Sequence, residues 1–227
     1  MTRTGLFSTL TLCAIVASVA AMIGGAAEDS KPKAKIGEAA PAFTLEDSNG
    51  KTHSLSDYMG KIIVLEWINP QCPVCVRVYK SGIIEDTIEK LKSLDADLVY
   101  LAINSTNSDK NKGPEENLAF LKEHKIDIPA LVDEDGTVGH LYGARTTPHV
   151  FVIDAEGVLR YQGALDDDGS GSKAKKGETV TNYAVNALQQ IKAGETVAPD
   201  STQSYGCNVK YKDDGMDTGK PRGRSKN

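Results

Sequence analysis

Apolar residues change their spacing along this chain, which predicts alternating strands and helices. Continuous apolar runs at 62–68 and 98–103 are typical of strands buried on both faces. Between these runs, apolar residues follow helical spacing from Pro73 to about Leu94, and Gly82 is expected to bend or interrupt that helix. Further along, the pattern predicts a short helix over 115–124, a short strand over 130–132 and one or two helical turns over 138–142.

Two turn sequences predict hairpins near the two ends of this pattern. Asp-Ser-Asn-Gly at 47–50 joins two short alternating segments, and Asp-Ala-Glu-Gly at 154–157 separates two apolar segments. A helix over 181–192, capped beyond by Gly194, closes the domain. Strand–helix–strand–helix followed by a hairpin and a last helix implies an α/β fold with a mixed sheet.

Segments of different composition flank this domain. Residues 1–27 combine Arg3, an uncharged apolar run and small residues before Glu28, which is the pattern of a cleaved secretory signal peptide. An uncleaved membrane anchor is the alternative. We expect a spacer at 28–35, the folded domain at 36–196 and a C-terminal tail at 197–227 that is disordered from about Lys210.

One internal segment, Asp166 to Glu178, is rich in Gly, Ser, Asp and Lys. Its three consecutive aspartates are interpreted as part of a mobile, solvated loop, because their spacing matches no calcium-binding loop.

The composition of the chain disfavours several further classes of function. The chain has 227 residues, of which 40% are hydrophobic, and a net charge of −5. This is enough apolar material for a core, and the mild acidity disfavours nucleic-acid binding. Four cysteines are too few for a disulfide-rich scaffold. If the signal peptide is removed with Cys13, an odd number remains, so Cys72, Cys75 and Cys207 cannot all pair within one chain.

The sequence Cys72-Pro73-Val74-Cys75 carries the candidate chemistry. Cys72 follows a buried strand and Pro73 opens a helix, so the Cys72 sulfur is expected at a helix N-terminus, where a thiolate is favoured. We expect Cys72 to be exposed and to attack disulfides, and Cys75, one turn on, to be more buried and to resolve the mixed disulfide. A structural zinc site or a structural disulfide are the alternatives.

These residues, with the run at 60–67 and Thr147-Pro148 before a strand, resemble the thioredoxin superfamily. The closest similarity is to its exported redoxin branch, which includes the alkyl hydroperoxide reductase/thiol-specific antioxidant type and the membrane-tethered cytochrome-maturation type. The resemblance covers about 36–194. It implies a thioredoxin-like three-layer fold, with a mixed central sheet, flanking helices and an N-terminal hairpin addition.

The resemblance also implies roles for individual residues. Glu66 lies six residues before Cys72, where thioredoxins hold a buried acid that exchanges a proton with the second cysteine. Burial would raise the pKa of that carboxyl. Pro148 matches the proline that is cis in the family, which would bring the backbone of Thr147 beside Cys72 for pairing with a substrate strand.

The chain also departs from the family. Gln71 stands where thioredoxins usually have Trp, and Pro73-Val74 replaces Gly-Pro, which leaves the direction of electron flow open. The peroxiredoxin signature Pro-x-x-x-Thr-x-x-Cys is missing, because Leu65 and Asn69 stand in its place. An arginine usually completes a peroxidase site, and Arg145, near Pro148, is either a candidate for that role or a surface side chain. A thiol-dependent peroxidase is therefore the alternative function.

Two further residues are possible auxiliaries. Cys207 lies in a Gly-Cys segment, 204–211, whose alternation would let it dock as an added strand. It could resolve a disulfide, pair between chains or be an inert packed thiol. His149 could tune the thiolates. A metal- or copper-handling module that uses Cys72 and Cys75 with either residue is the alternative from another class.

The sequence therefore predicts an exported, periplasmic or extracellular thiol–disulfide oxidoreductase. Its expected partners are protein thiols and disulfides and a redox partner that supplies or accepts electrons. No dissociable cofactor, metal, nucleic acid or membrane span after signal cleavage is expected.

Overall fold

A computed structural model of the chain describes residues 33–107 and 113–212. The predicted signal peptide, most of the predicted spacer and the end of the predicted tail lie outside the described residues. Within the described part, no helix is both long enough and apolar enough to cross a membrane.

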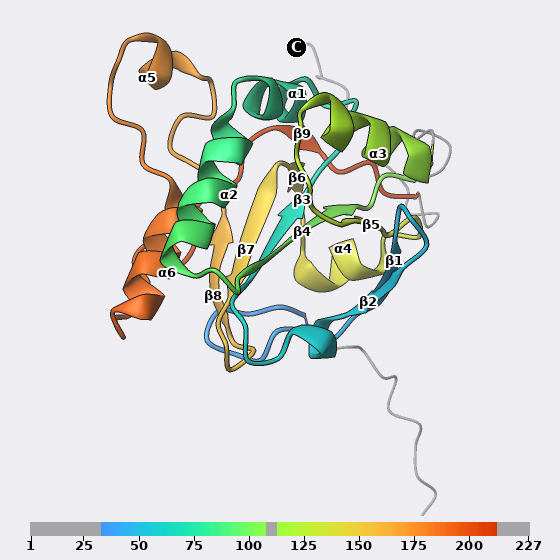
Figure 1. Cartoon of the computed structure of the whole chain (residues 1–227), viewed down its shortest axis with the longest axis horizontal. Helices are drawn as coiled ribbons and strands as arrows, with labels where there is room; N and C mark the ends of the chain where they lie inside the picture. The colour runs from blue at the N-terminus through green and yellow to red at the C-terminus, as the bar shows by residue number, and fades with distance from the viewer. Residues whose placement is uncertain (1–32, 108–112, 213–227) are drawn as a thin grey trace, which may run out of the picture. The chain divides into compact units, whose positions relative to one another are not determined.

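The elements alternate as the periodicity predicts (Figure 1). The strands are β1 (Thr44–Asp47), β2 (Thr52–Ser54), β3 (Ile63–Trp67), β4 (Val99–Asn104), β5 (Ala130–Val132), β6 (Thr146–Thr147), β7 (His149–Ile153), β8 (Leu159–Gly163) and β9 (Cys207–Asn208). The helices are the 3₁₀ helix η1 (Leu55–Tyr58), α1 (Pro73–Lys80), α2 (Ile83–Leu94), α3 (Pro114–Glu123), α4 (Thr137–Tyr142), α5 (Ser172–Lys175) and α6 (Tyr183–Lys192).

Seven of these strands form one mixed sheet in the order β2-β1-β5-β4-β3-β7-β8. The central strands β3, β4 and β5 are parallel, and β7 joins β3 antiparallel. The predicted hairpins are present as β1–β2 and β7–β8. Strands β6 and β9 form a separate two-stranded ladder. The predicted mixed α/β fold with an N-terminal hairpin is therefore confirmed.

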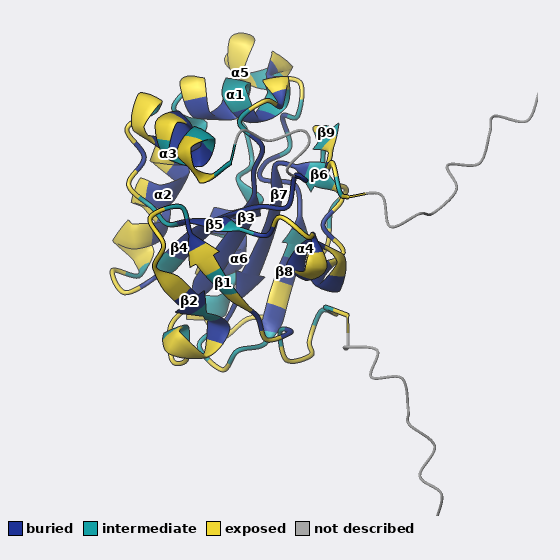
Figure 2. Ribbon diagram, turned by 90° about the vertical axis from the view of Figure 1, so that its right-hand side faces the viewer, coloured by how far each residue is buried: buried dark blue, intermediate teal, exposed yellow. Residues whose placement is uncertain are grey.

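The central strands are buried on both faces, as their continuous apolar runs require (Figure 2). Alternate residues of β3 face opposite ways, so Val64 joins the core under α1, α2, α3 and α6, and Leu65 joins the core with α4 and η1. Glu66 points the same way as Val64. The sheet thus directs Glu66 toward the layer that contains α1.

The predicted long helix is interrupted at Gly82, as its glycine suggested. Gly82 has φ +76 and stands before the first residue of α2. Only glycine adopts this left-handed conformation readily. Helix α1 therefore ends at Lys80 and α2 begins in a new direction at Ile83.

Two expectations about solvated segments were wrong in part. Asp166 and Asp168 are buried, at 2% and 3% exposed. The Asp168 carboxylate accepts backbone N–H groups of Lys173 and Ala174 in α5. Burial of a carboxylate is tolerable when such donors replace water, so the start of this segment is a hydrogen-bonded turn. Ser170, Ser172 and residues 174–178 are exposed, as expected. Tyr211, in the part of the tail expected to be disordered, is also packed, because its hydroxyl donates to the carbonyl of Ala144 at 2.7 Å.

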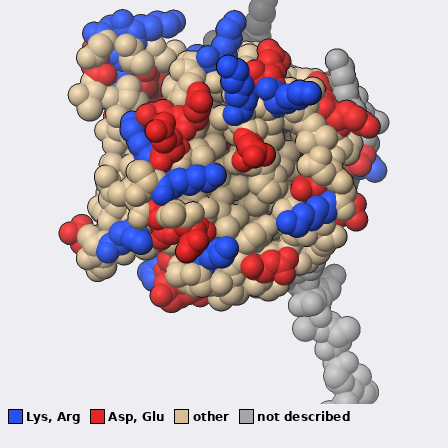
Figure 3. All heavy atoms as spheres, viewed as in Figure 1, with Lys and Arg blue, Asp and Glu red and all other residues tan. Residues whose placement is uncertain are grey.

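Positive and negative side chains are interspersed on the face shown in Figure 3. That face carries no extended patch of one sign of the kind that nucleic-acid binding requires.

Candidate active site

Cys72 lies where the sequence predicts, between a buried strand and a helix. It precedes the first residue of α1, with Pro73 at the first helical position. Its thiol lies 3.1 Å from the carbonyl oxygen of Thr147, to which it donates when protonated. The Thr147–Pro148 peptide bond is cis, as the resemblance implies. The fold therefore brings together the Cys-Pro-Val-Cys segment and a residue 75 positions away.

The two cysteines of this segment ionise very differently. Hydrogen bonding from the Cys75 thiol is the main cause that lowers the pKa of Cys72 to about 4, and hydrogen bonding with Cys207 lowers it further. Cys75 is fully buried, and burial raises its pKa, with further increases from the Cys72 sulfur and the Glu66 charge. At neutral pH the pair therefore holds one thiolate, on Cys72, and one thiol, on Cys75.

Glu66 is fully buried on β3 beneath these thiols. One carboxylate oxygen, Oε2, accepts the hydroxyls of Tyr100 at 2.8 Å and Tyr79 at 3.0 Å. The other oxygen, Oε1, has no hydrogen-bond partner among the described residues. Burial raises the pKa of Glu66 to about 7, and the two tyrosine hydroxyls oppose that rise. The carboxyl can thus gain or lose a proton near neutral pH, through an oxygen that is free to do so.

The sequence analysis missed the roles of these two tyrosines. Tyr79 follows Cys75 by four residues, so helical spacing places both on one face of α1. Tyr100 pairs with Val64, two residues before Glu66 on the neighbouring parallel strand. Helix and strand periodicity could have placed both side chains near Glu66, but the apolar pattern counted them as core.

One expectation about Cys72 was wrong. Its side chain is not exposed, because Cys72 has only 2% of its surface accessible. Strand β9 covers it by pairing with β6, so that Cys207 lies opposite Thr147. The predicted docking of the Gly-Cys segment as an added strand is confirmed. As a consequence, the three cysteines of the described residues, Cys72, Cys75 and Cys207, lie close together.

His149 does not join the cysteines. It alternates with Val150 on β7 and lies on the sheet face that carries Trp67 and Phe151, opposite to Glu66. Its Nδ1 atom accepts the backbone N–H of Arg145 at 3.2 Å. Burial, aided by the Arg145 charge, lowers the pKa of His149 to about 4. The imidazole is therefore neutral at physiological pH, and its role as an auxiliary to the thiolates is not supported.

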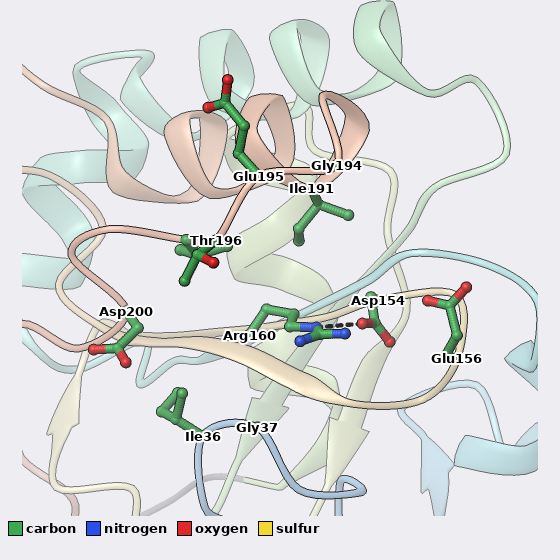
Figure 4. A pocket seen from close by; sticks show the side chains of 11 residues that line it. Ile36, Gly37, Asp154, Glu156, Arg160, Ile191, Gly194, Glu195, Thr196 and Asp200 are labelled. Carbon is green, nitrogen blue, oxygen red and sulfur yellow. Dashed lines mark hydrogen bonds and ion pairs between the residues drawn. The ribbon is translucent and has the colours of Figure 1, made fainter.

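The described residues, 33–107 and 113–212, hold no group of three or more His, Cys, Asp or Glu side chains arranged to bind a metal ion. The hollow in Figure 4, of about 400 Å³, is lined by α6, the segment after it and the β7–β8 turn, with an ion pair between Arg160 and Asp154 at its wall. No cysteine lines this hollow, so a molecule bound in it would not contact the Cys72 sulfur.

Comparison with known proteins agrees with the fold and with the thiol chemistry of this site. The profile of the AhpC/TSA family matches residues 36–162. Peroxiredoxin Q of Populus jackii is 29% identical over 136 residues, which cover 56% of this chain and 59% of that protein. The thiol-disulfide oxidoreductase ResA of Bacillus cereus is 27% identical over 126 residues, which cover 55% of this chain and 67% of that protein. The chain thus spans about three fifths of the length of its peroxiredoxin Q relatives.

The fold has solved counterparts as well. A hypothetical protein of Sinorhizobium meliloti superimposes with a TM-score of 0.65 at 26% identity, covering 79% of this chain and 96% of that one. Together with the strand order and the site geometry, the family match confirms the predicted thioredoxin-like three-layer fold.

Proposed function

We propose that this chain, which belongs to the AhpC/TSA family, is a thiol–disulfide oxidoreductase that exchanges electrons between the Cys72–Cys75 pair and protein partners. The observation that carries the proposal is the unequal ionisation of that pair, with a thiolate at Cys72 and a buried thiol at Cys75. A thiolate attacks disulfides and a thiol does not. The pair is thus prepared for two steps in a fixed order.

In the first step, the Cys72 thiolate attacks one sulfur of a target disulfide. The bond between the two target sulfurs breaks, the first target thiolate leaves, and Cys72 becomes joined to the target. In the second step, Cys75 attacks the Cys72 sulfur and the second target thiolate leaves. The target gains two electrons and takes up two protons, and the protein is left with a Cys72–Cys75 disulfide. The reverse sequence oxidises a target dithiol.

Glu66 is proposed to remove the proton of Cys75 between these steps. Cys75 must become a thiolate, yet burial raises its pKa. The Glu66 carboxyl has a pKa of about 7 and a free oxygen, Oε1. A base of this pKa is half ionised at neutral pH, so it can both take up and return a proton.

Thr147 and Pro148 are proposed to position the target. The Thr147 carbonyl lies 3.1 Å from the Cys72 thiol. Backbone groups of β6 are able to pair with an extended chain, since β9 already pairs with them. A target segment in the same place would bring its own cysteine beside Cys72.

A thiol peroxidase is the second candidate, favoured by the likeness to peroxiredoxin Q. Against it stand Leu65 and Asn69, which replace the proline and threonine of the peroxiredoxin signature. Asn69, at the threonine position, is buried and carries an amide in place of a hydroxyl. A peroxide at Cys72 would therefore lack the hydroxyl donor that usually activates it.

The reduction potential of the Cys72–Cys75 pair tests the proposal. The mature protein is equilibrated in graded dithiol and disulfide buffers, alkylated and weighed, with Cys72→Ser as the matched control that cannot pair. We expect a reversible two-electron transition between about −270 and −120 mV. A pair that stays oxidised below about −300 mV, or never forms, would contradict the proposal.

Trapping experiments separate the two candidates. Cys75→Ser combined with Cys207→Ser should accumulate a mixed disulfide between Cys72 and a model peptide disulfide, because neither neighbouring thiol is left to carry out the second step. The peroxidase alternative predicts instead that hydrogen peroxide rapidly oxidises Cys72 to a sulfenic acid. It also predicts that the protein consumes peroxide as fast as it reduces disulfides.

Export is a separate part of the proposal, supported by the apolar run and small residues within 1–27. The N-terminal sequence of the protein recovered from an exporting host tests it. Cleavage near residues 26–27 is expected, and an intact N-terminus would contradict it.

A further inference from the structure

The C-terminal segment, defined here as residues 201–211, passes directly over Cys72. Its strand β9 pairs antiparallel with β6, and in Figure 1 the two lie side by side next to α1. Cys207 is the residue opposite Thr147. Because opposed residues of an antiparallel pair project to the same face, Cys207 lies on the side of Thr147. Cys207 packs against the core cluster that contains Cys72 and Cys75.

Two neighbours of the Cys207 sulfur affect its ionisation through hydrogen bonding, namely the Cys72 sulfur and the backbone N–H of Val74 in the first turn of α1. Burial raises the pKa of Cys207, and the neighbouring Cys72 sulfur raises it further. The Cys72 thiolate and the Cys207 thiol therefore lie together at the N-terminus of α1, as the Cys72 thiolate and the Cys75 thiol also do.

Gly206 makes this close approach possible. A Cβ atom at position 206 would lie 2.1 Å from the carbonyl oxygen of Thr147, and Gly206 has φ +117. Neither the distance nor the backbone conformation suits a residue with a side chain. The Gly-Cys sequence is thus the one that lets a strand lie on β6 and present a thiol beside Cys72.

The segment is held to the domain on both sides of Cys207. Upstream, the Thr202 hydroxyl accepts the backbone N–H of Ala164 at 2.9 Å, and the Tyr205 hydroxyl donates to Asp166 at 2.8 Å. Downstream, the Val209 N–H donates to the Arg145 carbonyl at 2.9 Å. These anchors belong to separate parts of the domain, so the segment is a built element of the fold.

This segment therefore occupies the place that a target needs. Backbone groups of β6 that would pair with a target chain are already paired with β9. Cys72 is 2% exposed as a result. Either the segment leaves when a target arrives, or it acts as a target itself, and the position of Cys207 fits the second role.

Resting on the proposed function, we propose that Cys207 is a third redox-active thiol, an internal target that exchanges disulfides with Cys72. In the oxidised protein, the Cys207 thiolate attacks the Cys72 sulfur of the Cys72–Cys75 disulfide. A Cys72–Cys207 bond forms, the Cys72–Cys75 bond breaks and Cys75 leaves as a thiolate. The proton lost by Cys207 is matched by the one that Cys75 takes up, and the number of electrons does not change. The oxidised protein thus exists as two disulfide isomers, one of which fastens the segment over the site.

Oxidation of the Cys75→Ser variant tests the proposal, because it isolates Cys72 and Cys207. The variant is equilibrated with mixtures of reduced and oxidised glutathione, alkylated and mapped by peptide mass spectrometry. We expect an intramolecular Cys72–Cys207 disulfide. Recovery of only glutathione adducts or disulfides between two chains would overturn the proposal. Mapping the oxidised wild-type protein gives a second, mutation-free readout, in which both isomers are expected.

Gly206→Ala, added to Cys75→Ser, tests the geometry. Its Cβ would push the segment away from Thr147, so the glutathione concentration that opens half of the Cys72–Cys207 bond should fall by about tenfold or more. Gly177→Ala is the matched control, since Gly177 also has positive φ, +71, but open space around its Cβ position. Equal effects of the two substitutions would contradict a role for the docked strand.

Cys207→Ser keeps the failures of the two proposals apart. If this variant forms the reversible Cys72–Cys75 disulfide while Cys75→Ser forms no Cys72–Cys207 bond, the internal target is wrong and the proposed function stands. If Cys207→Ser forms no reversible Cys72–Cys75 disulfide, the proposed function fails, and the inference that rests on it fails too. Trp67 fluorescence, from the single tryptophan of the chain, verifies that each variant is folded.

Discussion

Replacing Glu66 with Gln should remove a pH dependence of stability whose size follows from the structure. Burial raises the pKa of this carboxyl from 4.5 to about 7. At about 1.4 kcal/mol per pH unit, that rise corresponds to about 3 kcal/mol of folding free energy. For a raised pKa, the stabilisation is fully present below 4.5 and is lost as the pH rises through 7.

Glu66→Gln keeps the shape of the side chain and an oxygen that can accept both tyrosine hydroxyls, but it cannot ionise. The buried amide group adds a cost that is the same at every pH. The difference in unfolding free energy between variant and wild type should therefore change by about 3 kcal/mol from pH 4 to pH 8, in favour of the variant at high pH. Cys72 titrates in both proteins, so its opposite contribution cancels in this difference.

Urea unfolding of the reduced proteins, followed by the fluorescence of the buried Trp67, measures this difference at several pH values. Glu89→Gln, which removes an exposed carboxylate from α2, is the control and should give a curve parallel to that of the wild type. Parallel curves for Glu66→Gln would refute the reasoning, because Glu66 would then ionise alike in the folded and unfolded chains.

Three further predictions follow from other contacts of the described residues. Thiolate absorbance of the reduced protein should titrate first at Cys72, near pH 4. Cys75→Ala should raise that midpoint because alanine cannot replace the hydrogen bond from the Cys75 thiol, and an unchanged midpoint would argue against this cause. Tyr100→Phe removes one hydroxyl from the carboxylate, so the pKa of Glu66, followed by infrared absorption of its carboxyl, should rise, and a fall would contradict the stated cause. The Asp133 carboxylate accepts two backbone N–H groups at the start of α4 and the Ser105 hydroxyl at 2.5 Å, and Asp133→Asn weakens this acceptor. Unfolding in urea should show a loss of about 1–3 kcal/mol in the free energy of unfolding. No loss would mean that solvent replaces these hydrogen bonds.

Most of the sheet could be predicted because its signals are local. The apolar run of β3 and the turn sequences of both hairpins each depend on neighbouring residues, and the structure contains all of them. Gly82 likewise interrupts the helix through its own backbone conformation. The burial of Glu66 followed from its place in a strand that is buried on both faces.

The covering of Cys72 could not be predicted in the same way. It depends on a contact between Thr147 and Cys207, which are 60 residues apart in the sequence. The strands that contain them, β6 and β9, are joined by only two residue pairs. Alternation in the tail indicated a strand but not its partner. The buried Asp166 was missed for a related reason, since its hydroxyl donor, Tyr205, comes from the same distant tail. Polar composition indicates solvent exposure only until a remote segment supplies hydrogen bonds.

The place of β9 after β3, α1 and β6 in the sequence has a consequence for biosynthesis. A ribosome makes the polypeptide from its N-terminus, and domains fold in that direction as they emerge. Strand β3, both thiols of the Cys-Pro-Val-Cys segment and β6 are all made before Cys207. Each new molecule therefore passes through a period in which Cys72 is uncovered and open to oxidants or to other unfinished chains, and this period ends only when the last strand is released and docks.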